Sequence, residues 1–276
     1  MSDITLIDDS EQSSLVTNGL AKNGEMYLKK AGSTDAGSIV VYDSGVWKGF
    51  PNEAVSYLNQ YSVSLDGAND YISIPSSTDF DFGTGPFSFS MWFYLTNVNG
   101  YGGLVYRSSG YRVKFQGSDQ TIKMELGSFR PIVVQHGSSL LNAWHHLVIV
   151  GDRSENKIKG YLDAGTPYQT TMSSSVSLTA SGQPLFFGRH LTYYTAGLVD
   201  EFSVFNYALS ASDIASLRDT SGSNPVPADI SSLNPLGWWR MGENDGGTGT
   251  TITDQGSGGN DGTLTNGPTF STDVPS

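Results

Sequence analysis

Two glycine-containing segments of the chain combine aromatic rings with hydrogen-bond donors. In NVNGYGGLVYRSSGYR these residues are Tyr101, Tyr106, Arg107, Tyr111 and Arg112. In GRHLTYYTAG they are Arg189, His190, Tyr193 and Tyr194. Rings can stack on the apolar faces of sugars while side-chain donors bond the hydroxyls, a mixture typical of small-molecule sites. Tyr and Arg are also favoured at protein–protein interfaces, so the nine residues predict a ligand surface and leave glycan and protein ligands open.

The turn DGAND offers oxygen ligands of the kind that calcium prefers. Asp66, Asn69 and Asp70 lie within five positions of one another, but their spacing is not that of an EF-hand loop. A second interpretation is that Asp66 and Asp70 cap a tight turn around Gly67. The residues alone leave both interpretations open.

Patterns typical of catalysis are weak in this sequence. Asp200 and Glu201 form the best local acidic pair, but adjacent strand residues point to opposite faces, so we expect them not to act together as glycosidase carboxylates do. His145 and His146 diverge for the same reason and are expected to pack rather than bind a metal. There is no GxSxG segment and no cysteine, although composition alone does not exclude a Ser–His–Asp triad. We therefore predict no catalytic residue.

Short alternating segments must position these residues. YSVSLDG alternates apolar residues with serines, and FSFSMWFYL continues the pattern with an apolar face formed by Phe87, Phe89, Met91, Phe93 and Leu95. WHHLVIVGD, NKIKGYLDAG, PLFFGRH and AGLVDEFSVF follow, each bounded by Gly, Pro, Asn or Asp. Many short strands at this spacing predict an all-β sandwich, and the one helix expected after Tyr61 is LSASDIASLRD, capped by Ser210.

The first sixty residues differ from the rest. Ser38–Tyr42 and Val46–Phe50 flank an Asp-Ser-Gly turn and predict a small hairpin, and Asn52–Gln60 predicts a short helix. A lone hairpin needs something to pack against. Residues 1–60 are therefore either a flexible leader or an attachment region that orders on a partner, and the main domain is expected over 61–276.

The charge balance excludes some partners. Fifteen basic residues stand against 27 acidic ones, a net charge of −12, which disfavours nucleic acid. No apolar run is long enough to span a bilayer, and the start MSDITLIDDSEQ lacks the basic and apolar regions of a signal peptide.

Four segments in order, LDGANDYISIP, FSFSMWFYL, WHHLVIV…IKGYLDAG and GLVDEFSVFNYALSASDI, resemble the laminin-G-like, concanavalin A-like lectin/glucanase jelly roll. The resemblance spans Tyr61 to Gly267 and implies two antiparallel sheets packed face to face. It also implies a structural calcium near the LDG turn, and it adds Asp200 to the candidate ligands Asp66, Asn69 and Asp70.

The segment GWWRMGENDGG stands in an unusual place for this family. In many members a similar segment precedes the LDGxxDY strand, whereas here it comes last, with only 40 residues from Gly237 to Ser276. So short a segment cannot form a second core, and its tryptophans would leave an exposed apolar edge. We therefore expect 237–267 to return to the sandwich, in a circularly permuted order.

The segment NGEMYLKKAGSTDAGSIVVYDSGVWKGF resembles parts of bacteriophage fibre and head-decoration proteins, which also carry terminal jelly rolls. This resemblance implies a non-enzymatic, homo-oligomeric protein of the virion surface. Residues 1–60 would contact other virion proteins, and the jelly roll would contact particle neighbours or a host-surface glycan. The alternatives are a free carbohydrate-binding lectin module and, disfavoured by the lack of a carboxylate pair, a glycan-active enzyme.

Overall fold

The structure is a computed structural model. It describes residues 58–276, apart from 98–99, 118–119, 127–128, 130 and 136–139, and the backbone of four N-terminal strands. The chain divides into two compact units, Met1–Leu58 and Asn59–Ser276. The helix expected over Asn52–Gln60 lies largely outside the described residues, and residues 58–60 are not helical.

The first unit contains a four-stranded sheet. In the order of the sheet its strands are β1 (Thr5–Ile7), β2 (Met26–Lys29), β3 (Ile39–Asp43) and β4 (Val46–Gly49). Strand β1 pairs with β2 in parallel, and the other pairs are antiparallel. The hairpin predicted from the sequence is therefore β3–β4, and it forms part of a larger sheet.

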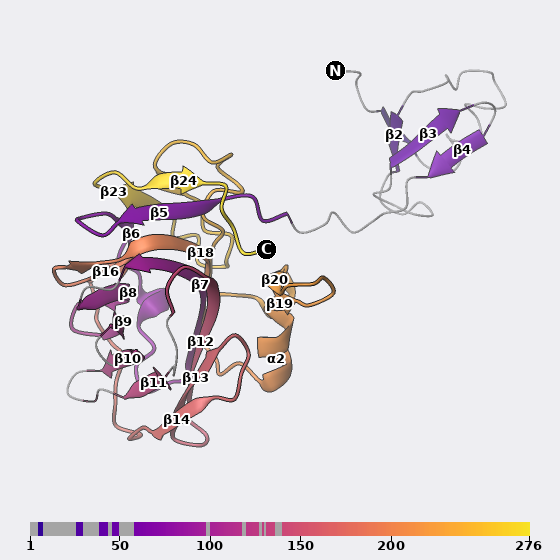
Figure 1. Cartoon of the computed structure of the whole chain (residues 1–276). Coiled ribbons are helices and arrows are strands. Elements are labelled where there is room, and N and C mark those ends of the chain that lie inside the picture. The colour runs from indigo at the N-terminus through magenta and orange to yellow at the C-terminus, as the bar shows by residue number, and fades with distance from the viewer. Residues whose placement is uncertain are drawn as a thin grey trace. The chain divides into compact units, whose positions relative to one another are not determined.

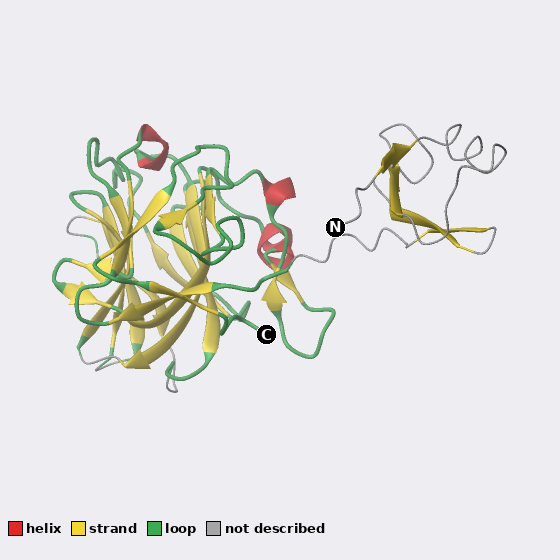
Figure 2. Ribbon diagram, turned by 90° about the horizontal axis from the view of Figure 1, so that it is seen from above, coloured by secondary structure: helices red, strands yellow, loops and turns green. Residues whose placement is uncertain are grey.

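The second unit is a sandwich of two antiparallel sheets, so the predicted all-β jelly-roll class is confirmed (Figure 2). We name the sheets after a central strand. The β8 sheet runs in the order β11 (Ile132–Gln135), β10 (Thr121–Leu126), β9 (Tyr111–Gln116), β8 (Tyr101–Arg107), β15 (Leu185–Phe187), β6 (Tyr71–Ile74), β23 (Gly262–Thr265) and β22 (Thr251–Ile252). The β7 sheet runs in the order β14 (Tyr168–Thr171), β13 (Lys157–Leu162), β12 (Trp144–Asp152), β7 (Phe87–Asn97), β18 (Ala196–Phe205), β5 (Ser62–Asp66) and β24 (Thr269–Ser271), with β21 (Gly237–Trp239) also paired to β18.

The core lies between the sheets and follows the alternation of the strands. Phe187 of β15 and Phe202 of β18 approach with their ring centroids 3.9 Å apart, which joins the two sheets. Trp239 is fully buried beside both rings. Burial of three large aromatic side chains at one point stabilises the sandwich strongly, because aromatic rings bury the most apolar surface per residue.

The C-terminal segment contributes to both sheets. Strand β21 pairs with β18, β23 pairs with β6, and β24 pairs with β5. Figure 1 shows the yellow strand β24 beside the indigo strand β5, although more than two hundred residues separate them. Both tryptophans of GWWRMG are therefore buried rather than exposed at an edge, Trp239 in the core and Trp238 against Glu201.

Short helical elements complete the unit. The helix α2 (Ala211–Ser216) begins at the predicted cap, where Ser210 and Asp213 form a capping box. A hairpin of β19 (Arg218–Asp219) and β20 (Val226–Pro227) follows it. Another short hairpin, β16 (Arg189–His190) with β17 (Tyr193–Tyr194), precedes β18. Among the described residues no helix is long and apolar enough to cross a membrane.

Candidate functional site

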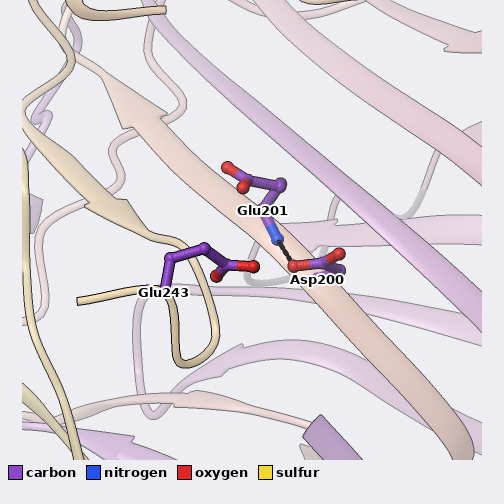
Figure 3. Close-up of side chains that lie close together, drawn as sticks. All are labelled: Asp200, Glu201 and Glu243. Atoms are coloured by element: carbon purple, nitrogen blue, oxygen red, sulfur yellow. Dashed lines mark hydrogen bonds between the residues drawn. The ribbon is translucent and has the colours of Figure 1, made fainter. Parts of the chain in front are cut away.

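Three carboxylates meet beside β18, an interior strand of the β7 sheet. Oxygen atoms of Asp200, Glu201 and Glu243 lie within 4.8 Å of one another (Figure 3). Asp200 is fully buried and Glu201 nearly so, both on β18, whereas Glu243 comes from the loop after β21. We call these three residues the acidic cluster.

The expectation that Asp200 and Glu201 diverge is wrong. The pairing of β18 with β7 shifts register between Asp200 and Ser203, and Glu201 has a left-handed φ of 47°. Such a bulge interrupts the alternation of side chains along a strand. The amide of Glu201 therefore donates to Oδ1 of Asp200 at 2.8 Å, and the two carboxylates stay close (Figure 3).

Glu201 has strong partners of its own. The indole Nε1 of Trp238 donates to its Oε2 at 2.7 Å, and Nε of Arg240 forms an ion pair with its Oε1 at 3.0 Å. Arg240 therefore compensates one of the three negative charges in the cluster.

Asp200 and Glu243 receive neutral donors from the segment that enters β5. Asn59 Nδ2 donates to Asp200 Oδ2 at 2.8 Å, and the backbone amides of Gln60 and Tyr61 both donate to Glu243 Oε1 at 2.8 Å. Two buried oxygens, Asn59 Oδ1 and Glu243 Oε2, have no hydrogen-bond partner. Unpaired buried acceptors are costly, so these oxygens are suited to a cation.

Burial makes the negative charges unfavourable without such a cation. Desolvation, aided by Glu201 and Glu243, raises the pKa of Asp200 well above its usual range. Burial likewise raises the pKa of Glu243 to about 7. The gathered ligand atoms are carboxylate oxygens, which fits calcium, and Asp200, Glu201 and Glu243 are the residues that would hold it.

The turn predicted to bind calcium is built differently. Asp66 Oδ1 accepts from the amides of Ala68, Asn69 and Asp70 at 2.8–3.4 Å, and Asp70 Oδ2 accepts from the amide of Asp66 at 3.2 Å. Since Asp66 pairs with Ala196 of β18, Asp200 lies four residues further along, about 13 Å away. The four predicted ligands therefore do not form one site, and the turn has the geometry of the capping interpretation.

The aromatic residues gather on the outer face of the β8 sheet, the side that faces away from the β7 sheet. Phe186 lies there because its neighbours Leu185 and Phe187 point into the core. Its ring contacts Tyr71 edge-on at 5.4 Å and stacks near Tyr106 at 6.0 Å. These rings form an apolar layer over three neighbouring strands.

The β16–β17 hairpin lies directly on this layer. A Cβ placed on Gly103 of β8 would meet the carbonyl carbon of Arg189 at 2.0 Å, so only glycine allows the hairpin to approach so closely. The Arg189 guanidinium lies 4.7 Å from the Tyr71 ring centroid, and Tyr193 packs edge-on against Tyr101 at 5.1 Å. Tyr193 is 41% exposed, which makes it the ring of this face most open to solvent among the predicted residues.

Charged groups lie under the hairpin on the same face. Glu125 forms ion pairs with Lys114 at 2.6 Å and Arg112 at 3.2 Å, and these cations also lie over the rings of Tyr101 and Tyr106. His190 is buried beside them, with neither ring nitrogen hydrogen-bonded. Burial and the charge of Lys114 lower its pKa to about 4, so the imidazole is neutral at pH 7.

Arg107 and Tyr111 require a correction, because the structure separates them from the other seven predicted ligand residues. The two residues pair with each other across β8 and β9, and they point inward because Tyr106 and Arg112 next to them point outward. Both are fully buried, and Arg107 bonds Asp81 at 2.6 Å. Neither can contact a ligand on the outer face.

Asn59 and Glu243 are site residues that the sequence did not reveal. Asn59 is 141 positions from its partner Asp200, so no local spacing connects them. Glu243 stands in GWWRMGENDGG, and the expected return of that segment to the sandwich was the only signal that could have placed it near Asp200.

Residues 66–215 match the concanavalin A-like lectin/glucanases superfamily. The chain belongs to this superfamily. The match ends before β21, so Glu243 and the C-terminal strands of this superfamily member lie outside it. No curated protein matches the sequence.

Solved structures share the fold of this superfamily member at low sequence identity. A "putative carbohydrate binding protein" from Bacteroides ovatus is 16% identical with a TM-score of 0.63, over 92% of this chain and 71% of that chain. The extracellular region of zebrafish Gpr126/Adgrg6 is 13% identical with a TM-score of 0.50, over 78% of this chain and 26% of that chain. At this identity the similarity shows the fold alone.

Proposed function

We propose that the second unit is a non-enzymatic carbohydrate-binding module whose ligand lies on the outer face of the β8 sheet, beside the β16–β17 hairpin. The observation that carries this proposal is the layer of rings and cations formed by Tyr71, Tyr101, Phe186, Arg189 and Tyr193. Sugars offer apolar faces to such rings and hydroxyls to such cations. The description of the Bacteroides ovatus protein as a "putative carbohydrate binding protein" supports the same class of ligand.

The acidic cluster supports a role without catalysis. Asp200 is fully buried, and the cavity beside Glu201, lined also by Ser90, Trp92 and Ser203, measures about 10 Å³. That space suits a single water molecule and has no room for a sugar ring. The cluster instead suits a structural calcium, and we propose that Asp200, Glu201 and Glu243 hold it.

The glycan proposal is tested with the full chain on an immobilised glycan array, followed by calorimetry on the glycans retained. We expect Tyr193→Ala and Arg189→Ala each to weaken binding about tenfold or more, since each removes a stacking or charged contact. Tyr168→Ala is the matched control, because Tyr168 is similarly exposed at 40% but lies on the β7 sheet. Unchanged affinity in both hairpin variants would reject this face as the binding surface.

A finer proposal concerns where the module works. We propose that it is displayed on a bacteriophage virion, with residues 1–60 attaching it to particle proteins and the chain forming a homo-oligomer. The support is the resemblance of residues 23–50 to fibre and head-decoration proteins, together with the separate compact unit that contains β1 to β4. The alternative is a free lectin module.

Light-scattering mass distinguishes these two roles. We expect the full chain to form a defined oligomer and a chain starting at Tyr61 to be monomeric, because the first unit would carry the assembly contacts. If both chains are monomers, self-assembly through the first unit is rejected and the free module is favoured.

A further inference from the structure

A second cavity opens on the outer face of the β7 sheet. It measures about 500 Å³, within the usual range of small-molecule sites, and it lies on the other sheet from the hairpin face. Trp92 and Tyr94 of β7 line the cavity. They face outward because the residues that alternate with them, Met91, Phe93 and Leu95, point into the core. Other lining residues are Trp144, Asp163, Arg218 and Asn224.

The aromatic walls of this cavity are held in place before any ligand binds. The indole of Trp144 donates to Asp273 Oδ1 at 3.0 Å and packs against Tyr94 with ring centroids 5.8 Å apart. Trp92 stacks on His146 at 4.8 Å, and His146 Nε2 lies 2.8 Å from Ser90 Oγ. Walls fixed in this way lose little side-chain entropy when a flat ligand stacks on them.

The polar groups of the cavity include one unsatisfied donor. The Arg218 guanidinium lies 5.7 Å from the centroid of the Trp92 ring, and its buried Nε has no hydrogen-bond partner. Asp163 accepts from His145 Nδ1 and from the amide of His146, both at 2.8 Å, and its side chain is 41% exposed. A donor and an acceptor thus stand beside the partly exposed rings of Tyr94 and Trp144, whereas Trp92 is only 4% exposed.

The charges around the cavity favour an uncharged ligand. Burial and the charge of Arg218 lower the pKa of His146 to about 3, so this imidazole is neutral. The positive charge of Arg218 is then balanced by the negative charge of Asp163, and Asp273 adds a further negative charge beside Trp144. A carboxylated ligand would meet these two carboxylates.

We infer that this cavity binds a neutral pyranose sugar, with its apolar face on the rings of Trp144 and Tyr94 and its hydroxyls bonded to Arg218 and Asp163. The inference does not depend on the hairpin face. If both sites bind, one chain engages glycans through both sheets of its sandwich and can bridge two sugar chains, which raises avidity without any new contact.

The test titrates the full chain with lactose, maltose and cellobiose, and with glucuronate as the charged counterpart, while tryptophan emission is recorded. Trp92 and Trp144 line this cavity, whereas the hairpin face is built from tyrosine and phenylalanine. We expect a saturable emission change with at least one neutral sugar. Arg218→Gln and Trp144→Ala should each weaken the affinity for that sugar about tenfold or more. Tyr193→Ala and Lys157→Gln should leave that affinity unchanged.

Trp144→Phe guards against misfolding, because it keeps an aromatic wall and should retain most of the affinity. Several results would overturn the inference: no saturable change with any neutral sugar, a response to glucuronate alone, or a response that survives both Arg218→Gln and Trp144→Ala. Loss of the response in Tyr193→Ala would assign the sugar to the hairpin face instead. If the hairpin face binds no glycan, the tryptophan emission change caused by sugar in this cavity should still be observed.

Discussion

The two acidic regions of the sandwich use similar residues in opposite ways. In the Asp66–Asp70 turn, carboxylate oxygens accept from backbone amides of the same turn. These amides lower the pKa of Asp66, the Ala68 amide most of all. In the acidic cluster, burial raises the pKa of Asp200 and Glu243, and Glu243 Oε2 has no partner. The turn carboxylates are bonded within the turn, whereas the cluster has one cation, Arg240, beside its three carboxylates.

This difference shows that a metal site is marked by buried oxygen atoms without hydrogen-bond donors, rather than by acidic residues that are close in sequence. Three acidic or amide residues within five positions are common in turns, where the backbone satisfies them. A buried carboxylate without a compensating charge is costly and persists where something else offsets that cost. The comparison makes calcium the ligand whose addition should separate the two regions most clearly.

Calcium should therefore raise the thermal stability of the full chain through the cluster. At a free concentration one hundred times its Kd, a ligand that binds only the folded state contributes about 2.7 kcal/mol. For a unit of this size that corresponds to a rise in Tm of about 5–10 °C, measured by scanning calorimetry against EDTA. Asp200→Asn with Glu243→Gln should abolish the rise.

The matched control for this experiment is the turn. Asp66→Asn with Asp70→Asn removes two carboxylates at the position first predicted to bind calcium, and we expect it to retain the full calcium response. A response lost in the turn variant and kept in the cluster variant would reverse the assignment of the two regions.

A smaller effect should appear as a pH dependence in EDTA. Folded Glu243 keeps its proton up to about pH 7, whereas the unfolded carboxyl releases it near pH 4.5. The folded chain thus binds more protons between these values, so the contribution of Glu243 to the free energy of unfolding falls as pH rises through this window. The expected loss is on the order of 2 kcal/mol, after allowing for partial solvent screening.

The measurement compares chemical unfolding of the wild type and Glu243→Gln at several pH values. The difference between the two chains is needed because His146 and His190, with lowered pKa values, contribute a stability that rises with pH up to about 6.5. If the two chains show parallel profiles from pH 4.5 to 7, Glu243 does not carry the raised pKa.

The sequence predicts the fold better than it predicts the sites. Strand alternation and turn residues were sufficient for the sandwich, and the Ser210 cap and the β3–β4 hairpin were found because their signals are local. The alternation of side chains along β8 also places Arg107 inside and Tyr106 outside, once the pairing of β8 with β9 is known. That register depends on a turn between them, which the pattern of residue types did not define.

The acidic cluster could not be predicted, for two physical reasons. The bulge at Glu201 breaks the two-residue period, and nothing in the residue types around Asp200 marks it. The third carboxylate, Glu243, and the donor Asn59 come from distant segments that tertiary pairing brings to β18. Long-range pairing decides the site, so only the topology of the whole sandwich could reveal it.

The smallest effect concerns the turn itself. Asp66→Ala removes an acceptor for three backbone amides, so we expect a loss of about 1 kcal/mol in the free energy of unfolding, measured in urea. Asp70→Asn keeps an oxygen that can accept from the Asp66 amide and should change stability by less than about 0.5 kcal/mol. Because the turn oxygens are already satisfied, both variants should lose the same stability in calcium and in EDTA. A loss in Asp66→Ala that grows when calcium is present would mean that the turn binds the metal after all, and the contrast between the two acidic regions would fail.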